Sequence, residues 1–264
     1  MTKTIVMLSG LPRSGSTVLT SILNQHPNVQ ATTTSPVADL ITGVIETWPN
    51  ISQAIIDPNP KQYGNILNSV IQGAHQHVDK STIIDKNRLW PRIAPTWYHT
   101  TDAKLKIICT VRDIPDILAS YILLFERNLP ATNFVDQDLI EMKLPVNNKN
   151  RCKILWEKYI GHPYNSLKIG YNSRCADMLF VDYTDIVFNA QITMDKICNF
   201  IGIGSLPIDT NDLRRMDEND KFHGGIEGLH YVRPILEKTS PAPHQVIGHE
   251  LTQYYKDMKL NFWQ

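Results

Sequence analysis

Short apolar runs alternate with stretches of helical periodicity along this chain. Residues 3–10, 81–85, 104–111 and 178–181 are compact and rich in apolar residues, several of them β-branched, which is typical of buried strands. Apolar residues recur at helical spacing over 17–25, 35–48, 62–78, 114–127, 151–160, 190–201 and 245–258. This alternation predicts an α/β fold with a doubly wound parallel sheet, and we expect one domain over residues 1–264.

Two segments interrupt the pattern. Residues 128–150 contain Pro and Asn and are only weakly periodic, so we interpret them as a surface excursion over the site and a candidate acceptor lid. Residues 211–244 are polar, with glycines at 224, 225 and 228, and predict a folded-over loop before the last helix.

Charge and composition narrow the range of possible binding partners. The chain holds 26 Lys and Arg against 26 Asp and Glu, so no overall field attracts it to nucleic acid or to an anionic membrane. No stretch approaches the ~18 apolar residues of a membrane span, and the start lacks the features of a secretory signal. The four cysteines form no C-x-x-C pair; Cys152 and Cys175 would pair only after export, so a cytoplasmic setting is favoured.

A phosphate-binding loop is predicted after the first strand, at residues 9–17. Gly10 and Gly15 have the spacing of the P-loop G-x-x-x-x-G-K-[ST], but Ser16 occupies the lysine position and the positive charge lies at Arg13. Backbone N–H groups, the start of the next helix and the hydroxyls of Ser14, Ser16 and Thr17 would bind an oxyanion. The missing lysine argues against a P-loop small-molecule kinase, which stays an alternative beside a non-catalytic nucleotide-binding module.

A second anion-binding group is predicted at the end of the strand 104–111. Arg112 follows this strand, at the edge where open α/β sheets bind ligands. Ser120 lies eight residues further on, about two helical turns away. An arginine in this place suits a bidentate contact with a phosphate.

These segments together resemble the PAPS-dependent sulfotransferases (PAPS is 3′-phosphoadenosine 5′-phosphosulfate; the product is PAP, adenosine 3′,5′-bisphosphate). The matching stretches are residues 12–17, the strand end 106–113 with Ser120, the segment 179–185 and the late segment 229–234. The loop is closer to the protein-tyrosine and bacterial branches, which use Arg, than to the cytosolic branch, which uses Lys. The resemblance implies sulfuryl transfer from PAPS to a hydroxyl of an unidentified acceptor, with no metal and no nucleic acid partner.

The resemblance also implies roles for single residues. Arg112 and Ser120 would hold the ribose 3′-phosphate, Tyr183 would lie near the adenosine, and Lys86 would bridge toward the leaving phosphate. The 211–244 loop would close over the donor with Arg233 and Lys238. The phosphosulfate itself would bind to Pro12, Arg13, Ser14, Gly15, Ser16 and Thr17.

The general base is not fixed by the resemblance. The glutamate of one branch falls at Thr34, and the histidine of the other falls at Asn87-Arg88. His230 is favoured as base because histidine is a ready proton acceptor and the late loop should border the sulfur. The other candidates are Asp39, Glu46, His75, His77 and His223.

The acceptor stays open between carbohydrate, lipid, carrier-bound acyl chain and small metabolite. The missing glutamate, together with Pro36 where that branch has an arginine, argues against acidic tyrosine peptides. Two interpretations are open for Trp48, Trp90, Trp97 and Tyr98: an apolar surface that contacts the acceptor, or packing in the core.

Overall fold

The structure is a computed structural model that describes residues 3–213, 226–237 and 241–264. Its centre is a five-stranded parallel sheet of order β2-β3-β1-β4-β5. The strands are β1 (Thr4–Gly10), β2 (Val29–Ala31), β3 (Thr82–Lys86), β4 (Leu105–Val111) and β5 (Ala176–Asp182). The predicted α/β fold and its parallel sheet are confirmed. The three-residue strand β2 was not predicted, because it is too short to show a pattern.

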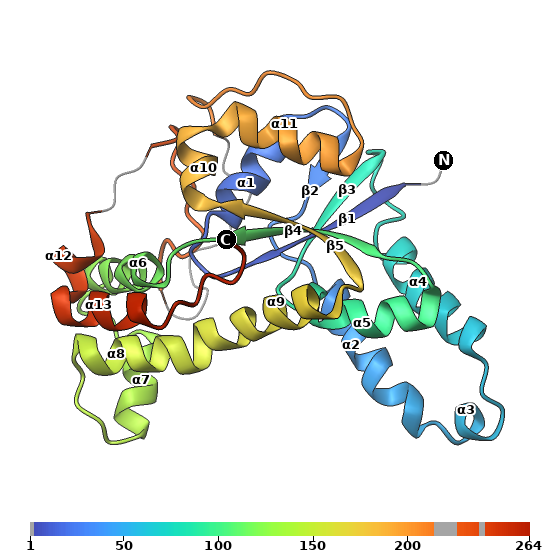
Figure 1. Ribbon diagram of the computed structural model, residues 1–264, viewed down its shortest axis with the longest axis horizontal. Helices are drawn as coiled ribbons and strands as arrows, with labels where there is room; N and C mark the ends of the chain where they lie inside the picture. Colours follow the sequence, from blue (N-terminus) through green and yellow to red (C-terminus); the bar gives the residue numbers. More distant parts are fainter. Residues whose placement is uncertain (1–2, 214–225, 238–240) are drawn as a thin grey trace.

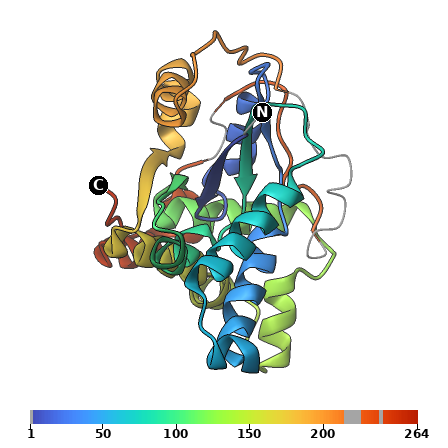
Figure 2. The ribbon, with the colours of Figure 1, turned by 90° about the vertical axis from the view of Figure 1, so that its right-hand side faces the viewer.

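Helices cover both faces of the sheet (Figure 1). On one face lie α1 (Ser16–Leu23), α10 (Tyr183–Phe188) and α11 (Ala190–Ile201), which pack on strand residues such as Val6 and Leu8. The other face is covered by α2 (Val37–Thr47), α4 (Pro60–Ala74), α5 (Trp90–Thr101), α6 (Ile114–Arg127) and α9 (Gly161–Ser173). Figure 2 shows the same two layers at a right angle, with the orange α11 beside the strands at the upper left and the blue α2 below them.

Shorter segments extend the second layer away from the sheet. They are η1 (Trp48–Asn50), α3 (Ser52–Ile56), α7 (Phe134–Glu141), α8 (Asn148–Ile154), the π-helical η2 (Leu155–Ile160), α12 (Pro243–Ile247) and α13 (His249–Asp257). The helices α8, η2 and α9 follow one another without a break, so the predicted helix 151–160 runs on to Ser173. Within the described ranges, no helix is both long and apolar enough to cross a membrane.

The segment 128–150 is more ordered than its composition suggested. It contains α7 and the start of α8, and Val135 and Leu139 of α7 are fully buried. Asp136 accepts hydrogen bonds from two nitrogens of Arg151, at 2.7 and 2.8 Å, which fastens α7 to α8. The segment therefore contains more helix than predicted, because the helical signal of α7 is only eight residues long, and its role as an acceptor lid stays a prediction.

The tryptophans belong largely to the core. Trp90 is fully buried, and its indole Nε1–H donates to Asp85 Oδ1 at 2.9 Å; Trp97 is also buried. Trp48 stacks on Tyr63 with 4.9 Å between ring centroids. The interpretation of these rings as an apolar surface for the acceptor was wrong for Trp90 and Trp97, and core packing is the correct one. All four cysteines are buried and free, so Cys152 and Cys175 do not pair.

Candidate active site

A cavity of about 580 Å³ lies at the carboxyl ends of β1, β3 and β4. Parallel strands place their carboxyl ends at one edge of a sheet, where the following loops and helix starts form a crevice. Ten residues predicted from the sequence line this cavity: Arg13, Gly15, Ser16, Thr17, Lys86, Arg112, Ser120, Tyr183, His230 and Arg233. Segments more than 200 residues apart in the sequence thus meet at a single site.

The loop 9–17 turns sharply because of its glycines. Gly10 and Gly15 have φ angles of +145° and +89°, which side chains disfavour. A Cβ at Gly10 would lie 2.2 Å from Thr110 Oγ1, and one at Gly15 would lie 2.7 Å from the Tyr183 ring. The glycines therefore let the loop sit against β4 and against Tyr183 at the same time.

Ser14 and Pro12 do not line the cavity. Ser14 is fully buried, and its Oγ lies 2.6 Å from the Leu11 carbonyl oxygen and 2.7 Å from Thr110 Oγ1. The predicted contact of this hydroxyl with the donor differs from what the structure shows. The hydroxyl is engaged in holding the loop to β4, while Ser16 and Thr17 line the cavity.

Arg13 connects the loop to two other segments. Its Nε donates to Ser120 Oγ at 3.1 Å, and its Nη1 donates to the Leu229 carbonyl oxygen. Burial lowers the pKa of Arg13, and the nearby Arg112 and Arg127 add to this effect. An arginine remains charged in proteins even so, because its ordinary pKa is very high. Arg13 is thus a partly desolvated cation that a bound anion would stabilise.

Arg112 is held at the strand end by three neighbours. Its Nη1 donates to the Arg13 carbonyl oxygen at 3.1 Å, its Nη2 lies 3.6 Å from Asp116 Oδ1, and its Cζ lies 4.2 Å from the Tyr183 ring centroid. Only 6% of the residue is exposed. These contacts fix the guanidinium plane before any ligand arrives, which lowers the entropy lost on binding.

Lys86 reaches across the cavity from the end of β3. Its Nζ donates to Thr17 Oγ1 at 3.1 Å, so the lysine lies beside the first turn of α1. Its backbone N–H donates to Thr32 Oγ1 at 2.9 Å. A cation held beside a helix start is well placed for an anion bound there.

The candidates for the general base separate into two groups. His230 lines the cavity, as do Thr34 and the Asn87-Arg88 pair. Asp39 lies next to this wall, because Asn87 Nδ2 donates to Asp39 Oδ2 at 2.7 Å. The others do not line the cavity: His75 is buried against Asp85, Glu46 and His77 are exposed on the surface, and His223 lies outside the described residues, as does Lys238.

Several cavity residues were missed by sequence reasoning. They are Tyr121, Arg127, Phe134 and Tyr159, whereas Ser9 was predicted only as part of the loop and Arg88 only as part of the position where one branch has its base. Ser120, Leu124 and Arg127 follow i, i+4, i+7 spacing on α6, so extending the helical face from Ser120 would have identified Arg127. Phe134 and Tyr159 come from segments with no motif, so only their tertiary packing brings them to the site.

One buried atom in the cavity wall lacks a partner. Among the described residues, Ser9 Oγ is buried without a hydrogen bond, and Ser9 lines the cavity. An unpaired buried hydroxyl costs free energy, and a bound oxyanion would satisfy it. Together with the glycine turn and the cations above, this orphaned hydroxyl fits a phosphorylated or sulfated ligand.

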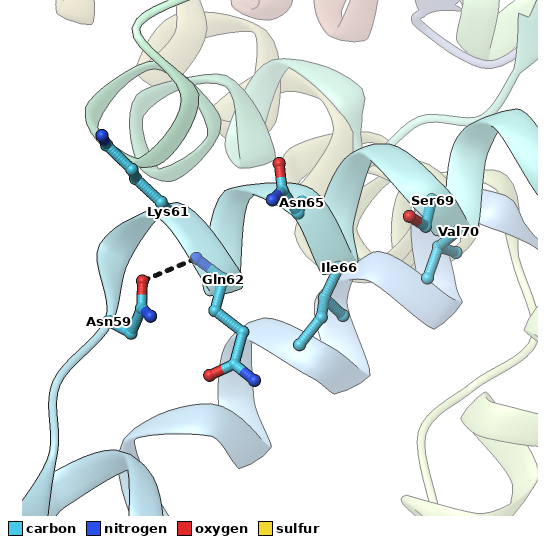
Figure 3. Close-up of a pocket in the computed structure, with 7 residues that line it drawn as sticks. All are labelled: Asn59, Lys61, Gln62, Asn65, Ile66, Ser69 and Val70. Carbon is cyan, nitrogen blue, oxygen red and sulfur yellow. Dashed lines mark hydrogen bonds between the residues drawn. The ribbon is translucent and has the colours of Figure 1, made fainter.

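A second hollow, of about 660 Å³, is a shallow trough along α4 (Figure 3). It is lined by Asn59, Lys61, Gln62, Asn65, Ile66, Ser69 and Val70, all from one helix and its cap. Although larger, the trough has a single charged group in its lining, and none of the cavity's residues contributes to it. Functional sites need converging groups from several elements, so the cavity at the strand ends is the candidate site.

Comparison with known proteins identifies the family. The model of the sulfotransferase domain family matches residues 3–222, and the chain therefore belongs to this family, an enzyme family that transfers sulfuryl groups from PAPS. No curated protein sequence matched the chain. The family assignment decides against the kinase alternative.

One solved structure shows the same fold, and two others are similar to this chain with lower TM-scores. A sulfotransferase domain from the curacin biosynthetic pathway is 16% identical, with a TM-score of 0.53 and 98% of each chain covered. A sulfotransferase from Alicyclobacillus acidocaldarius is also 16% identical (TM-score 0.47, 83% of this chain and 88% of the other). Mouse sulfotransferase SULT7A1, solved with PAP, is 14% identical (TM-score 0.45, 77% of this chain and 60% of the other).

Proposed function

We propose that the cavity at the strand ends binds PAPS and is the place where its sulfuryl group passes to a hydroxyl of the acceptor. The observation that carries this proposal is the contact between the two predicted anion-binding groups. Arg112 donates to the Arg13 backbone, and Arg13 donates to Ser120. A doubly phosphorylated adenosine needs two such groups within one cavity, and a ligand with a single anionic end does not.

The donor-binding roles follow from position. The turn at Gly15, Ser16 and Thr17, with Arg13, suits the phosphosulfate, because backbone N–H groups and a helix start meet a cation there. Arg112 and Ser120 suit the ribose 3′-phosphate. Tyr183 packs on both Gly15 and Arg112, which suits a residue beside the adenosine.

The chemistry needs charge stabilisation and a base. The donor supplies a sulfuryl group, whose bond to the phosphate oxygen breaks as the acceptor oxygen bonds to sulfur, and PAP leaves with the electron pair. Lys86 Nζ, beside Thr17, would stabilise charge developing on the leaving phosphate. His230, which lines the cavity, would take the acceptor's hydroxyl proton.

Two segments would enclose the reaction. Phe134 of α7 lines the cavity, which supports a role for residues 128–150 as an acceptor lid. Leu229, His230 and Arg233 line it from the late segment, which supports donor closure by residues 211–244 as far as these are described. Excluding water in this way would protect the sulfuryl group from hydrolysis.

We also propose a family branch, a cellular compartment and an acceptor class for this protein. An arginine in the phosphate loop supports the protein-tyrosine or bacterial branch rather than the cytosolic one. The four free, buried cysteines support a reducing, cytoplasmic setting. The acceptor is a hydroxyl on a small molecule, lipid, carbohydrate or carrier-bound chain, and no metal is required.

Calorimetry with PAP and with ATP tests the donor site. We expect PAP to bind clearly more tightly than ATP, because Arg112 and Ser120 require the 3′-phosphate. Transfer from radiolabelled PAPS to a panel of hydroxyl acceptors, with and without EDTA, tests the reaction. Equal affinity for the two nucleotides, or turnover abolished by EDTA, would overturn the proposal.

A further inference from the structure

One wall of the cavity carries groups that the donor does not account for. Aromatic rings from three elements meet there: the Tyr121 and Phe134 centroids lie 6.2 Å apart, and those of Phe134 and Tyr159 lie 4.5 Å apart. Arg88 and Arg127 line the same cavity. We name these five residues the acceptor wall.

Tyr121 has an unused hydroxyl. The residue is only 4% exposed, lines the cavity and makes no hydrogen bond within the described part of the chain. Burial raises the pKa of Tyr121, although Arg88 and Arg13 oppose this. The phenol therefore stays neutral and can donate. Tyr121 lines the same cavity as Arg13 of the proposed donor site and Arg88 of the acceptor wall.

Arg88 and Arg127 have no acidic partner among the described residues. Across the described residues, neither guanidinium forms an ion pair, although both side chains are exposed enough to accept one. Among the described residues, the cavity lining contains six Lys or Arg side chains and one carboxylate, Glu237, which lies 3.7 Å from Arg233. The proposed donor site uses four of these cations, namely Arg13, Lys86, Arg112 and Arg233.

Arg88 and Arg127, the two remaining cations, would repel one another and the cations of the donor site unless a further anion bound beside them. Arg127 and Arg13 line the same cavity, and the charge of Arg127 adds to the lowering of the Arg13 pKa by burial. An anion brought by the acceptor would remove this repulsion, and the three rings offer apolar surface for the atoms beside it.

We propose that the acceptor wall selects an acceptor that carries an anionic group, carboxylate or phosphate, beside an apolar or aromatic portion. Arg88 and Arg127 bind the anion, Phe134 and Tyr159 pack on the apolar portion, and the Tyr121 hydroxyl donates to the acceptor next to the reacting oxygen. This inference rests on the proposed sulfotransferase site and names its substrate class.

Matched acceptors test the proposal. The probes are 3-(4-hydroxyphenyl)propanoate with its amide and 3-hydroxydecanoate with its amide, which differ only in the charge, and 4-hydroxyphenethyl phosphate as the phosphate form. We expect kcat/KM for each anion to exceed that for its neutral partner by about tenfold or more, the gain of one charge-assisted hydrogen bond. Calorimetry of the same probes binding to the PAP-loaded protein gives a readout that needs no turnover.

Arg88→Gln and Arg127→Gln should each reduce this preference to about twofold or threefold, and Arg92→Gln, an exposed arginine on α5 outside the cavity, should leave it intact. PAP affinity should stay within about twofold of the wild type in all three variants, because the donor uses other cations. Tyr121→Phe should lower kcat for both members of a pair while PAP affinity is retained.

The outcomes separate the two proposals. Failure to bind PAP would overturn the proposed function and this inference with it. Normal PAP binding with equal affinity for charged and neutral probes would overturn the inference alone. A loss of PAP affinity in Arg88→Gln or Arg127→Gln equal to the loss for the anion would also overturn it, because these arginines would then belong to the donor site.

Discussion

Arg13 Nε donates a hydrogen bond to Ser120 Oγ over 3.1 Å, which joins the phosphate loop after β1 to the second turn of α6. The sequence interpretation assigned these residues to opposite ends of the donor. Their contact makes the loop and α6 one continuous surface, in which a ligand atom bound to either residue affects the other.

Ser120→Ala should therefore weaken PAP binding through two effects. The variant removes a hydroxyl donor for the 3′-phosphate and also frees the Arg13 side chain to move. We expect a loss of roughly 1 kcal/mol, or about fivefold in Kd, against a loss of about 10- to 100-fold for Arg112→Ala, which removes a charge. Calorimetric titration with PAP measures both. Ser69→Ala, on the exposed trough of α4, is the control and should bind PAP as the wild type does.

Lys86→Met should reduce turnover more than donor affinity. The ammonium group lies beside Thr17, where charge develops on the leaving phosphate only as the sulfur–oxygen bond breaks. Removing a group of this kind costs about 10²- to 10³-fold in kcat. Single-turnover rates with radiolabelled PAPS, beside PAP titration, separate the two effects. A Kd for PAP that rises as much as kcat falls would contradict this role.

His230→Gln should lower kcat by about 10²-fold or more, because the acceptor proton would then leave without a base. The loss should shrink at high pH, where hydroxide can replace the base, so the pH profile of kcat is the decisive measurement. His77→Gln, at an exposed position after α4 that does not line the cavity, is the control. If the variant kept full activity, Asp39, which is hydrogen-bonded to Asn87 on the cavity wall, would be the next candidate.

The sheet and the donor loop were predictable because their signals are local. Uninterrupted apolar runs define β1, β3 and β4, and the spacing of Gly10 and Gly15 defines the turn between β1 and α1. Arg112 was predictable for the same reason, since a strand end is visible in the sequence. At each of these positions the structural signal lies within a few residues of the chain, so it can be found from the local sequence.

The acceptor wall was not predictable because it depends on distant packing. Phe134 lies on α7, which Asp136 and Arg151 fasten to α8, and Tyr159 lies in the π-helical η2, so their places in the cavity depend on tertiary packing. The Ser14 hydroxyl was misassigned because its partner Thr110 lies 96 residues away. Side-chain direction in such places follows from the whole fold rather than from the neighbouring sequence.

Gly15→Ala should destabilise the protein and weaken PAP binding together. The residue has a φ of +89°, and the added Cβ would lie 2.7 Å from the Tyr183 ring, so both backbone strain and a steric clash oppose the change. We expect a loss of about 1–3 kcal/mol in the free energy of unfolding. Gly43→Ala is the matched control: a Cβ there meets no atom within 4 Å in the helix α2, and it should stabilise by about 0.5–1 kcal/mol. Urea unfolding measures both.

A buried carboxylate, Asp85, directly precedes Lys86 and accepts hydrogen bonds from three side chains. Asp85 is fully buried, and its Oδ2 accepts from His75 Nε2 at 2.8 Å and from Ser35 Oγ at 2.5 Å, while its Oδ1 accepts from Trp90 Nε1. Asp85→Ala would leave these donors without an acceptor in the core, so we expect a loss of roughly 3 kcal/mol or more in the free energy of unfolding.

Asp79→Ala, at an exposed position in the loop before β3, should change the free energy of unfolding by less than about 0.5 kcal/mol. Asp85→Asn, which keeps the shape and one carbonyl acceptor, should lie between the two. Because Ser35 also accepts from Asn87 through its carbonyl oxygen, the alanine variant should disturb the cavity wall beside Lys86 and lower kcat as well. An Asp85→Ala protein as stable and as active as the Asp79→Ala control would show that this network supports neither the core nor the site.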